Sequence, residues 1–231
     1  MTQTATKPPL IRGEWFPMSW EEFLDWAPDG VQAEWVDGRG MIQVTTSERH
    51  VAVLLLLTRL VAGYVDLFGL GRVFAPPFLM RLEGRPSGRE PDLMVVLNAH
   101  LNRVRRLWLE GPADFVVEGI SESSVEIDLV EKLNEYGAGG VPEYLALETR
   151  EGRDDTTLYR LDGDRVLRPV APDPQGRLHS LVLPGFWFDP AWFRQDPLPD
   201  HHDLLYAIAG RDYDEWLAAK RRAWLAAQGG E

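Results

Sequence analysis

Three short apolar runs with one helical segment among them constrain the fold of this chain most strongly. The runs are Leu93–Leu97, Phe115–Ile120 and Tyr144–Glu148, and each has the length and composition of a buried β-strand. A helix is expected from about Val125 to Ala138, between the last two runs. This strand–helix–strand order predicts an α/β protein with a mixed sheet flanked by helices.

The residues before these runs carry clear helix and turn signals. Ser19-Trp20-Glu21-Glu22 is a capping box and predicts a short helix that ends near Pro28. The turn pair Asp37-Gly38 predicts a β-hairpin made of Ala33–Val36 and Gly40–Val44. Thr46 or Ser47 can cap a long helix from about Glu48 to Phe68.

The remaining apolar runs predict further strands and a helical end. Val73–Leu82 is expected to form one strand before the acidic residues. Thr157–Leu161, Val166–Val170 and Ser180–Leu183 are short and separated by turn residues, so we expect an antiparallel meander. The tail from Asp203 should be helical, with acids early and basic residues late.

The length of 231 residues fits one large domain with an appendage. We expect a flexible lead-in over 1–18, one domain over 19–194, and a linker with the helical tail over 195–231. Apolar residues make up 45% of the chain and charged residues 26%, which are ordinary values for a globular protein.

The composition also bears on the compartment. Cysteine is absent, which excludes disulfides and thiolate zinc sites. No run reaches the roughly 18 uninterrupted apolar residues of a membrane span. Val51–Leu57 lies in a segment with charged residues and is expected to be a buried helix, and the N-terminus lacks the apolar core of a signal peptide. We therefore expect a cytoplasmic protein without a membrane partner.

A net charge of −12 argues against a nucleic-acid partner, because neutralisation of phosphates supplies most non-specific affinity. The arginines between Arg72 and Arg106 can still form a local basic patch.

Two acids and one lysine suggest a metal-assisted reaction. Asp92 directly precedes one apolar run, and Glu118 lies inside the next. Mg²⁺ commonly uses one or two protein carboxylates, with water and phosphate completing its shell. Lys132, on the expected helix, could stabilise charge on a phosphodiester. Asp92 can also be a plain turn residue, Glu118 half of a structural salt bridge, and Lys132 the partner of Asp128 in a solvated helical ion pair.

Three further residues are weaker candidates. Glu34 could be a third acid at the metal or the polar face of an amphipathic strand. His50 could contact a phosphate or the metal, or simply face solvent from the first turn of its helix. Arg89, in the segment before Asp92, is a candidate substrate contact. No Walker A loop, dinucleotide fingerprint or nucleophile elbow is present.

The ordered set of short motifs resembles the bacterial restriction endonuclease family called Uma-two, a branch of the PD-(D/E)xK nuclease superfamily. The matching segments, in order, are Ala33–Gly38, Ser47-xx-His50, Arg89–Asp92, Val117–Ser121, Asp128-xxx-Lys132-xxx-Tyr136, Gly139–Tyr144 and Pro184–Phe186.

This resemblance covers about Ser19 to Phe193 and implies a restriction-endonuclease-like fold. It also implies a Mg²⁺ site, for which Mn²⁺ could substitute, at Asp92 and Glu118, with Glu34 as a further acid. The superfamily lysine normally stands where this chain has Ile120, so Lys132 would be its migrated replacement.

Two functions follow as hypotheses. The first is a Mg²⁺-dependent endonuclease that cleaves DNA, for which a homodimer is expected because two strands need two sites. The alternative is a catalytically inactive nuclease fold that acts as an interaction module.

Overall fold

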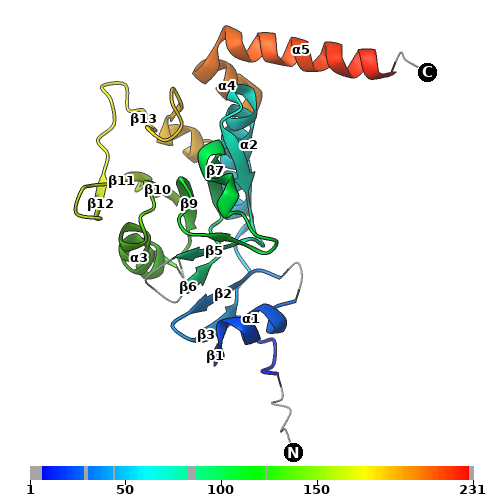
Figure 1. Cartoon of the computed structure of the whole chain (residues 1–231). Helices are drawn as coiled ribbons and strands as arrows, with labels where there is room; N and C mark the ends of the chain where they lie inside the picture. The colour runs from blue at the N-terminus through cyan, green and yellow to red at the C-terminus, as the bar shows by residue number, and fades with distance from the viewer. Residues whose placement is uncertain (1–6, 29–30, 44, 83–86, 123, 229–231) are drawn as a thin grey trace, which may run out of the picture.

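The structure is a computed structural model that describes residues 7–28, 31–43, 45–82, 87–122 and 124–228. Two six-stranded sheets and a two-stranded sheet are combined with five α-helices in this described part (Figure 1).

The larger sheet carries the three apolar runs that dominate the sequence. Its strands lie in the order β12 (Leu167–Pro169), β11 (Thr157–Leu161), β10 (Glu143–Glu148), β9 (Phe115–Ile120), β7 (Leu93–Leu97) and β4 (Gly71–Phe74). β9 and β10 are parallel and all other pairs are antiparallel. The predicted mixed sheet is therefore confirmed.

Half of the strands of the smaller sheet come from the N-terminal segment and half from residues 79–110. Its strands lie in the order β1 (Trp15–Pro17), β3 (Arg39–Ile42), β2 (Ala33–Val36), β6 (Ser87–Arg89), β5 (Leu79–Leu82) and β8 (Trp108–Glu110). Helix α1 (Trp20–Trp26) covers it through Trp20, Phe23 and Trp26, which belong to its hydrophobic core.

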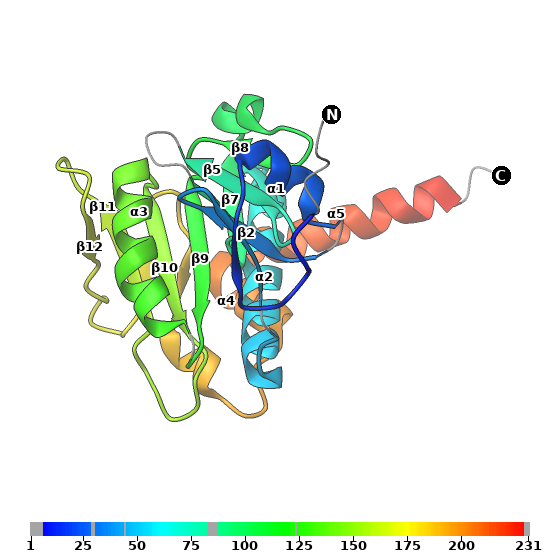
Figure 2. The same cartoon turned by 90° about the horizontal axis from the view of Figure 1, so that it is seen from below.

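Helices cover both faces of the larger sheet (Figure 2). Helix α2 (Glu48–Phe68) packs with Leu57, Leu60 and Val61 against one face, to which Val95 and Val117 point. The opposite face carries Met94, Val116 and Ile120 and packs against helix α3 (Lys132–Gly139). Each strand thus buries both of its faces, which explains its continuous apolar sequence.

Among the described residues, α2 is the single helix long and apolar enough, by length and composition, to cross a membrane. Eight of its side chains are buried, seven of them in the core against the larger sheet. It therefore has the packing of a core helix, as the charged residues beside Val51–Leu57 predicted.

Several predicted elements are confirmed. The Ser19 capping box is formed, and α1 ends at Trp26. The hairpin of β2 and β3 turns at Asp37 and Gly38, whose φ angles of 49° and 77° lie in the left-handed region that this turn requires. Ser47 caps α2 by accepting from the amide of His50.

The predicted single strand Val73–Leu82 is wrong. Pro76 and Pro77 lack backbone N–H donors and interrupt it, so β4 joins the larger sheet and β5 joins the smaller one. This break allows one stretch of chain to connect the two sheets.

The predicted strand Ser180–Leu183 is also wrong. The carboxylate of Glu143 accepts bonds from the amides of Leu181 and Val182 and from the Ser180 hydroxyl, so these groups bind a side chain instead of a strand. The short sheet here consists of β13 (Leu178–His179) and β14 (Trp187–Phe188).

Part of the range 1–18, where a flexible lead-in was expected, has regular structure. Residues 1–6 lie outside the described part, but β1 pairs with β3 from Trp15 to Pro17. The remaining short helices are η1 (Asn98–Arg103), the π-helical turn η2 (Ile127–Glu131) and η3 (Pro190–Arg194).

The predicted helical tail consists of two helices, α4 (His201–Ala209) and α5 (Arg211–Gln228). α4 packs on α2, where the Cδ1 atom of Leu205 lies 2.7 Å from the position that a Cβ would take at Gly63. α5 points away from the body of the molecule in both views (Figures 1 and 2).

Candidate active site

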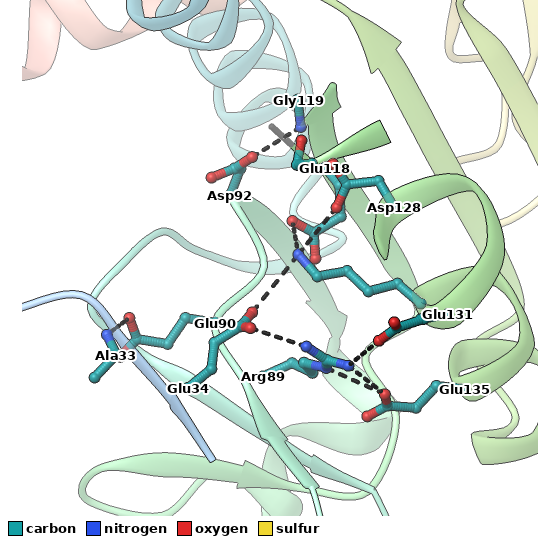
Figure 3. Close-up of polar contacts among 12 residues, drawn as sticks. Ala33, Glu34, Arg89, Glu90, Asp92, Glu118, Gly119, Asp128, Glu131 and Glu135 are labelled. Atoms are coloured by element: carbon teal, nitrogen blue, oxygen red, sulfur yellow. Dashed lines mark hydrogen bonds and ion pairs between the residues drawn. The ribbon is translucent and has the colours of Figure 1, made fainter. Parts of the chain in front are cut away.

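The candidate residues gather at the seam between the two sheets, under α3 (Figure 3). Glu34 comes from β2 and Arg89 from β6 of the smaller sheet, while Glu118 comes from β9 of the larger sheet. Asp92 precedes β7, and Lys132 begins α3. Figure 3 shows the side chains of Glu34 and Arg89 turned toward each other and the Asp92 carboxylate turned toward the amide of Gly119.

Glu118 lies on β9, and Asp92 directly precedes β7, the antiparallel neighbour of β9. Leu93 pairs with Val117, so the next step of this register places Asp92 opposite Glu118. Opposed residues on an antiparallel pair project from the same face at short distance. The Oδ2 atom of Asp92 also accepts the amide of Gly119 at 2.8 Å, which fixes this carboxylate beside β9.

Lys132 lies among three carboxylates. Its Nζ atom is 2.9 Å from Glu118 Oε2, 3.2 Å from Asp128 Oδ1 and 3.6 Å from Glu34 Oε1. The Lys132 side chain is only 7% exposed, so the solvated ion pair with Asp128 considered from the sequence is wrong. These carboxylates raise the pKa of Lys132 well above its usual value, although burial alone would lower it.

Each oxygen of Glu118 has its own partner. The Tyr136 hydroxyl donates to Oε1 at 2.5 Å, and Lys132 lies beside Oε2. Burial raises the pKa of Glu118 to about 8, with Asp92, Asp128 and Glu34 acting in the same direction and Lys132 opposing them. The partners of Glu118 are thus Tyr136 and Lys132, and Glu118 does not form a structural salt bridge with an arginine among the described residues.

Glu34 connects the two cations of the seam. Its Oε2 atom accepts from Arg89 at 2.9 Å, and its Oε1 atom faces Lys132. Burial tends to raise the pKa of Glu34, but Lys132 and Arg89 together hold it below its usual value. This carboxylate therefore remains ionised between its two partners.

Arg89 faces inward. It is buried, and its guanidinium also donates to Glu135 Oε2 from both Nε, at 3.1 Å, and Nη2, at 2.9 Å. The Arg89 guanidinium would have to leave Glu34 and Glu135 to contact a substrate. In this structure it links β6 to β2 and α3. Among the other arginines between Arg72 and Arg106, Arg72 lies over Phe74 and Arg81 over Trp20, while Arg85 falls outside the described residues.

Glu90 is a buried acid that was not a site candidate from the sequence. Its Oε2 atom accepts the amide of Ala33 at 2.7 Å, which links the segment before Asp92 to β2. Burial raises the pKa of Glu90 to about 8; the Ala33 amide opposes this shift and Glu34 adds to it.

His50 is buried and packs against Gly119, the residue that follows Glu118 in the chain. The Thr149 hydroxyl donates to the Ile120 carbonyl at 2.6 Å, so its oxygen accepts from His50 Nδ1 at 3.0 Å. This leaves Nε2 of a neutral His50 as the acceptor nitrogen. A Cβ at Gly119 would lie 2.7 Å from His50 Cε1, so glycine is needed for this contact. The expectation of a solvent-facing His50 is wrong.

Thr149 also lines two surface grooves, of about 720 and 570 Å³. Both grooves include the start of α2 and the residues after β10, with Arg49 and Arg150 among them. These arginines are engaged, because Arg49 donates to backbone carbonyls of Phe193 and Gln195 and Arg150 pairs with Glu148.

Carboxylates outnumber cations in the seam. Glu34, Asp92, Glu118, Asp128 and Glu135 face Lys132 and Arg89, and burial raises the pKa of Asp92 against the opposing effects of Lys132 and the Gly119 amide. Within the described part of the chain, no three His, Asp or Glu side chains are grouped as a metal site.

Three residues that make these contacts had no role predicted from the sequence. Tyr136 appeared only within a motif, and Glu135 and Thr149 were not singled out. Their partners Glu118, Arg89 and His50 are far away in the sequence, so no local spacing pointed to them. The sequence did carry one signal for a basic partner, because Glu131 and Glu135 are acids on two successive turns of the expected helix. That partner is Arg89.

The mixed sheets flanked by helices define an α/β fold. The Uma2 family, described as "Putative restriction endonuclease", matches residues 20–191, and the chain belongs to this family. The resemblance inferred from the ordered motifs is therefore confirmed.

A solved structure supports the same fold. It is the crystal structure of a protein from Anabaena variabilis described as a putative nuclease belonging to DUF820. The two chains are 13% identical with a TM-score of 0.58, and the match covers 87% of this chain and 99% of the other. No curated protein matches the chain.

Proposed function

We propose that this protein is a Mg²⁺-dependent endonuclease that hydrolyses phosphodiester bonds of DNA. The observation that carries this proposal is that the β7–β9 register, continued by one residue, places Asp92 opposite Glu118, with Lys132 Nζ 2.9 Å from Glu118. Family membership supports nuclease activity in general. The choice of Mg²⁺ as the metal and of DNA as the substrate is part of this proposal.

The residues fit a hard divalent cation. Asp92 and Glu118 supply two oxygen ligands, which is the usual protein contribution to a Mg²⁺ site. The buried excess of carboxylates over cations favours an added positive charge, and Glu34 Oε1 is buried and accepts no hydrogen bond within the described part of the chain. Asp92 and Glu118 would hold the ion, with Glu34 nearby, and Mn²⁺ could replace Mg²⁺. When bound, the ion would polarise the scissile phosphate and lower the pKa of a water.

Lys132 would act as a cation. Since its carboxylate neighbours raise its pKa, Lys132 stays protonated and cannot remove a proton from water at neutral pH. Its ammonium can instead orient the attacking water and stabilise the negative charge that develops on the phosphate oxygens. As water adds to phosphorus, the bond from phosphorus to the leaving oxygen would break; the attacking water would give up one proton to solvent and the leaving oxygen would take up one proton from solvent, so that one water is consumed for each bond cleaved.

The remaining residues would position these groups. Tyr136 orients Glu118 through its hydroxyl, and Glu34 holds Lys132 and Arg89 at a common carboxylate. His50, through Gly119, fixes the end of β9 that follows Glu118. We further propose that DNA in the cytoplasm is the substrate.

An inactive nuclease fold that serves as an interaction module is the second candidate. Lys132 is already paired with three acids, and this closed network would be stable without a metal. The two candidates predict opposite responses to metal.

The test is calorimetric titration of Mg²⁺ and Mn²⁺ into the wild type, Asp92→Asn and Glu118→Gln, with plasmid nicking measured in the same samples. Both variants retain an oxygen that can accept the existing bonds from Gly119 and Tyr136. Glu122→Gln is the matched control, because Glu122 follows β9 but its side chain is 81% exposed.

The proposal expects metal binding and nicking in the wild type and in Glu122→Gln, and loss of both in the two seam variants. Pure wild-type protein that binds no metal and leaves plasmid intact would overturn it in favour of the interaction module. Nicking that survives in Asp92→Asn and Glu118→Gln would also overturn it, because the activity would come from elsewhere.

A further inference from the structure

The charged groups of the seam leave the proton of the attacking water to another acceptor. Burial lowers the pKa of Lys132, but its carboxylate neighbours raise it well above the usual value, so the amine stays protonated. Burial raises the pKa of Glu34, but Lys132 and Arg89 together bring it below its usual value, so Glu34 is a weak base. Asp92 and Glu118 are committed to the ion in the proposed function.

Strand β9 extends past the end of β7 beside these acids. The first residue of β7, Leu93, pairs with Val117. Continued by one residue, this register places Asp92 opposite Glu118, and β7 has no strand residue to pair with Gly119. The Gly119 amide instead donates to the Asp92 carboxylate at 2.8 Å. The edge of β9 at Gly119 is therefore open on the side where Asp92 lies.

His50 packs where a side chain of Gly119 would stand. Its Cε1 and Nδ1 atoms lie 2.7 and 3.2 Å from the Cβ position of that residue. Burial raises the pKa of Asp92, and Lys132, the Gly119 amide and His50 oppose this shift. The His50 ring and the Asp92 carboxylate thus lie against the same glycine, within electrostatic reach of each other.

The hydrogen bonds of His50 determine which ring nitrogen carries the proton. The Thr149 hydroxyl donates its hydrogen to the Ile120 carbonyl, so His50 Nδ1 has to donate to the Thr149 oxygen. In a neutral imidazole, Nε2 is then an unprotonated acceptor on the side of the ring away from Thr149. Thr149 follows β10, which pairs with β9, so this lone pair is turned away from β10.

No protein group uses this lone pair. Within the described part of the chain, Nε2 of His50 makes no hydrogen bond, yet it is not enclosed as Glu34 Oε1 is. Water can therefore reach it. Because His50 is only 6% exposed, the packing around the ring holds it in this orientation.

We propose that His50 Nε2 accepts the proton that the attacking water gives up. The O–H bond of the water breaks, its electron pair stays on the oxygen that adds to phosphorus, and an N–H bond forms at Nε2. The imidazolium then releases one proton to solvent, and the leaving oxygen takes up one proton from solvent. Thr149 is a positioning residue, because its oxygen keeps the ring proton on Nδ1. This role of His50 rests on the proposed function.

The first test is rescue of His50→Ala by imidazole. The substitution removes the base and leaves space beside Gly119, so plasmid nicking with Mg²⁺ should slow by about a hundredfold or more. Imidazole in solution should restore part of the rate. A triazole, which has a ring of the same size but is a much weaker base, should restore little.

His100→Ala is the matched control. His100 Nδ1 also contacts a side-chain oxygen, that of Asp114, but it lies in η1 beyond the end of β7 that is away from Asp92. This variant should nick plasmid at the rate of the wild type and should not respond to imidazole.

Nitrogen NMR of metal-free protein with labelled histidine gives a measurement that does not depend on activity. The His50 signals, identified by their loss in His50→Ala, should show the proton on Nδ1. Thr149→Ser keeps the hydroxyl and should keep this state. Thr149→Val removes the acceptor, so it should move part of the proton to Nε2 and slow nicking while Mg²⁺ affinity is unchanged. This pair of variants decides the matter if His50→Ala does not fold.

Equal rescue of His50→Ala by both rings would overturn the proposal, because the ring would only fill space. Loss of Mg²⁺ binding in His50→Ala, measured by calorimetry, would overturn it in favour of a metal ligand. A wild-type proton on Nε2 would also overturn it. Nicking that persists in His50→Ala removes the proton acceptor alone, whereas a wild type that neither binds metal nor nicks plasmid removes the proposed function as well.

Discussion

Lys132 Nζ lies 2.9 Å from Glu118 Oε2, and the two residues come from different elements, α3 and β9. The position two residues after Glu118, where the superfamily lysine was expected, holds Ile120, which is buried in the core under α3. The Lys132 ammonium therefore reaches Glu118 from α3, while β9 keeps the apolar side chain of Ile120 in the core.

Lys132→Met should destabilise the metal-free protein. Removal of the ammonium leaves Glu34, Glu118 and Asp128 buried without their shared cation, and loss of one partner of a buried ion pair costs about 3–5 kcal/mol. Urea unfolding measures this loss, and Lys7→Met, at a lysine that is 59% exposed, should change stability little. Added Mg²⁺ should recover more stability in Lys132→Met than in the wild type. Equal stability of the variant and the wild type would contradict the network.

Tyr136→Phe should weaken metal binding in a pH-dependent way. The Tyr136 hydroxyl donates to Glu118 and favours its charged form, so its loss should raise the pKa of Glu118 further above about 8. The pH at which Mg²⁺ affinity reaches half its maximum should then rise, as measured by calorimetry. Tyr159→Phe is the control, because the Tyr159 hydroxyl makes no hydrogen bond within the described part of the chain. An unchanged profile in Tyr136→Phe would rule out this role.

Glu90→Gln should flatten the dependence of stability on pH. The native pKa of Glu90, about 8, exceeds the value of 4.5 for a free glutamate, so the native state binds more protons between these values. The free energy of unfolding should therefore fall as pH rises from 4.5 to about 8 and then level off. One pKa unit corresponds to about 1.4 kcal/mol, so the contribution amounts to a few kcal/mol.

Urea unfolding at a series of pH values measures this difference. Glutamine can still accept the Ala33 amide, so Glu90→Gln should gain stability over the wild type above pH 8 and little below pH 5. A gain that is independent of pH would indicate a packing effect and not a buried titrating carboxyl.

Gly119→Ala should displace His50. The new Cβ would lie 2.7 Å from His50 Cε1 and 3.1 Å from Leu54 Cδ1, and overpacking of this kind costs about 1–3 kcal/mol. Gly163→Ala is the matched control, since nothing lies within 4 Å of its Cβ position. In Gly119→Ala/His50→Ala, thermal unfolding should reveal a cost smaller than the sum of the single changes. Additive costs would show that the two residues do not press on each other.

Local elements were predictable because their signals are local. The Ser19 capping box, the Asp37-Gly38 turn and the Ser47 cap each act within a few residues, and each formed where it was expected. The apolar runs of β7, β9 and β10 are buried on both faces, which leaves a continuous hydrophobic sequence.

The rest depends on contacts between distant segments. The break at Pro76 and Pro77 was visible in the sequence, but the assignment of β4 and β5 to different sheets is set by pairing with β7 and β6. Likewise, the spacing of Asp128 and Lys132 on a helix cannot say whether that face meets solvent or β9. The burial of Lys132 follows from how α3 lies on the sheet.

Because Glu34 belongs to the smaller sheet while its partner Lys132 belongs to the helix on the larger one, the two sheets share a single charge balance. The N-terminal segment is therefore not a detachable module. A shortened chain that lacks β2 would retain Asp92, Glu118 and Lys132. It would lose Glu34, the carboxylate that Arg89 and the Lys132 ammonium share. Truncation and domain exchange at this boundary would change the chemistry of the site even when every candidate ligand is still present.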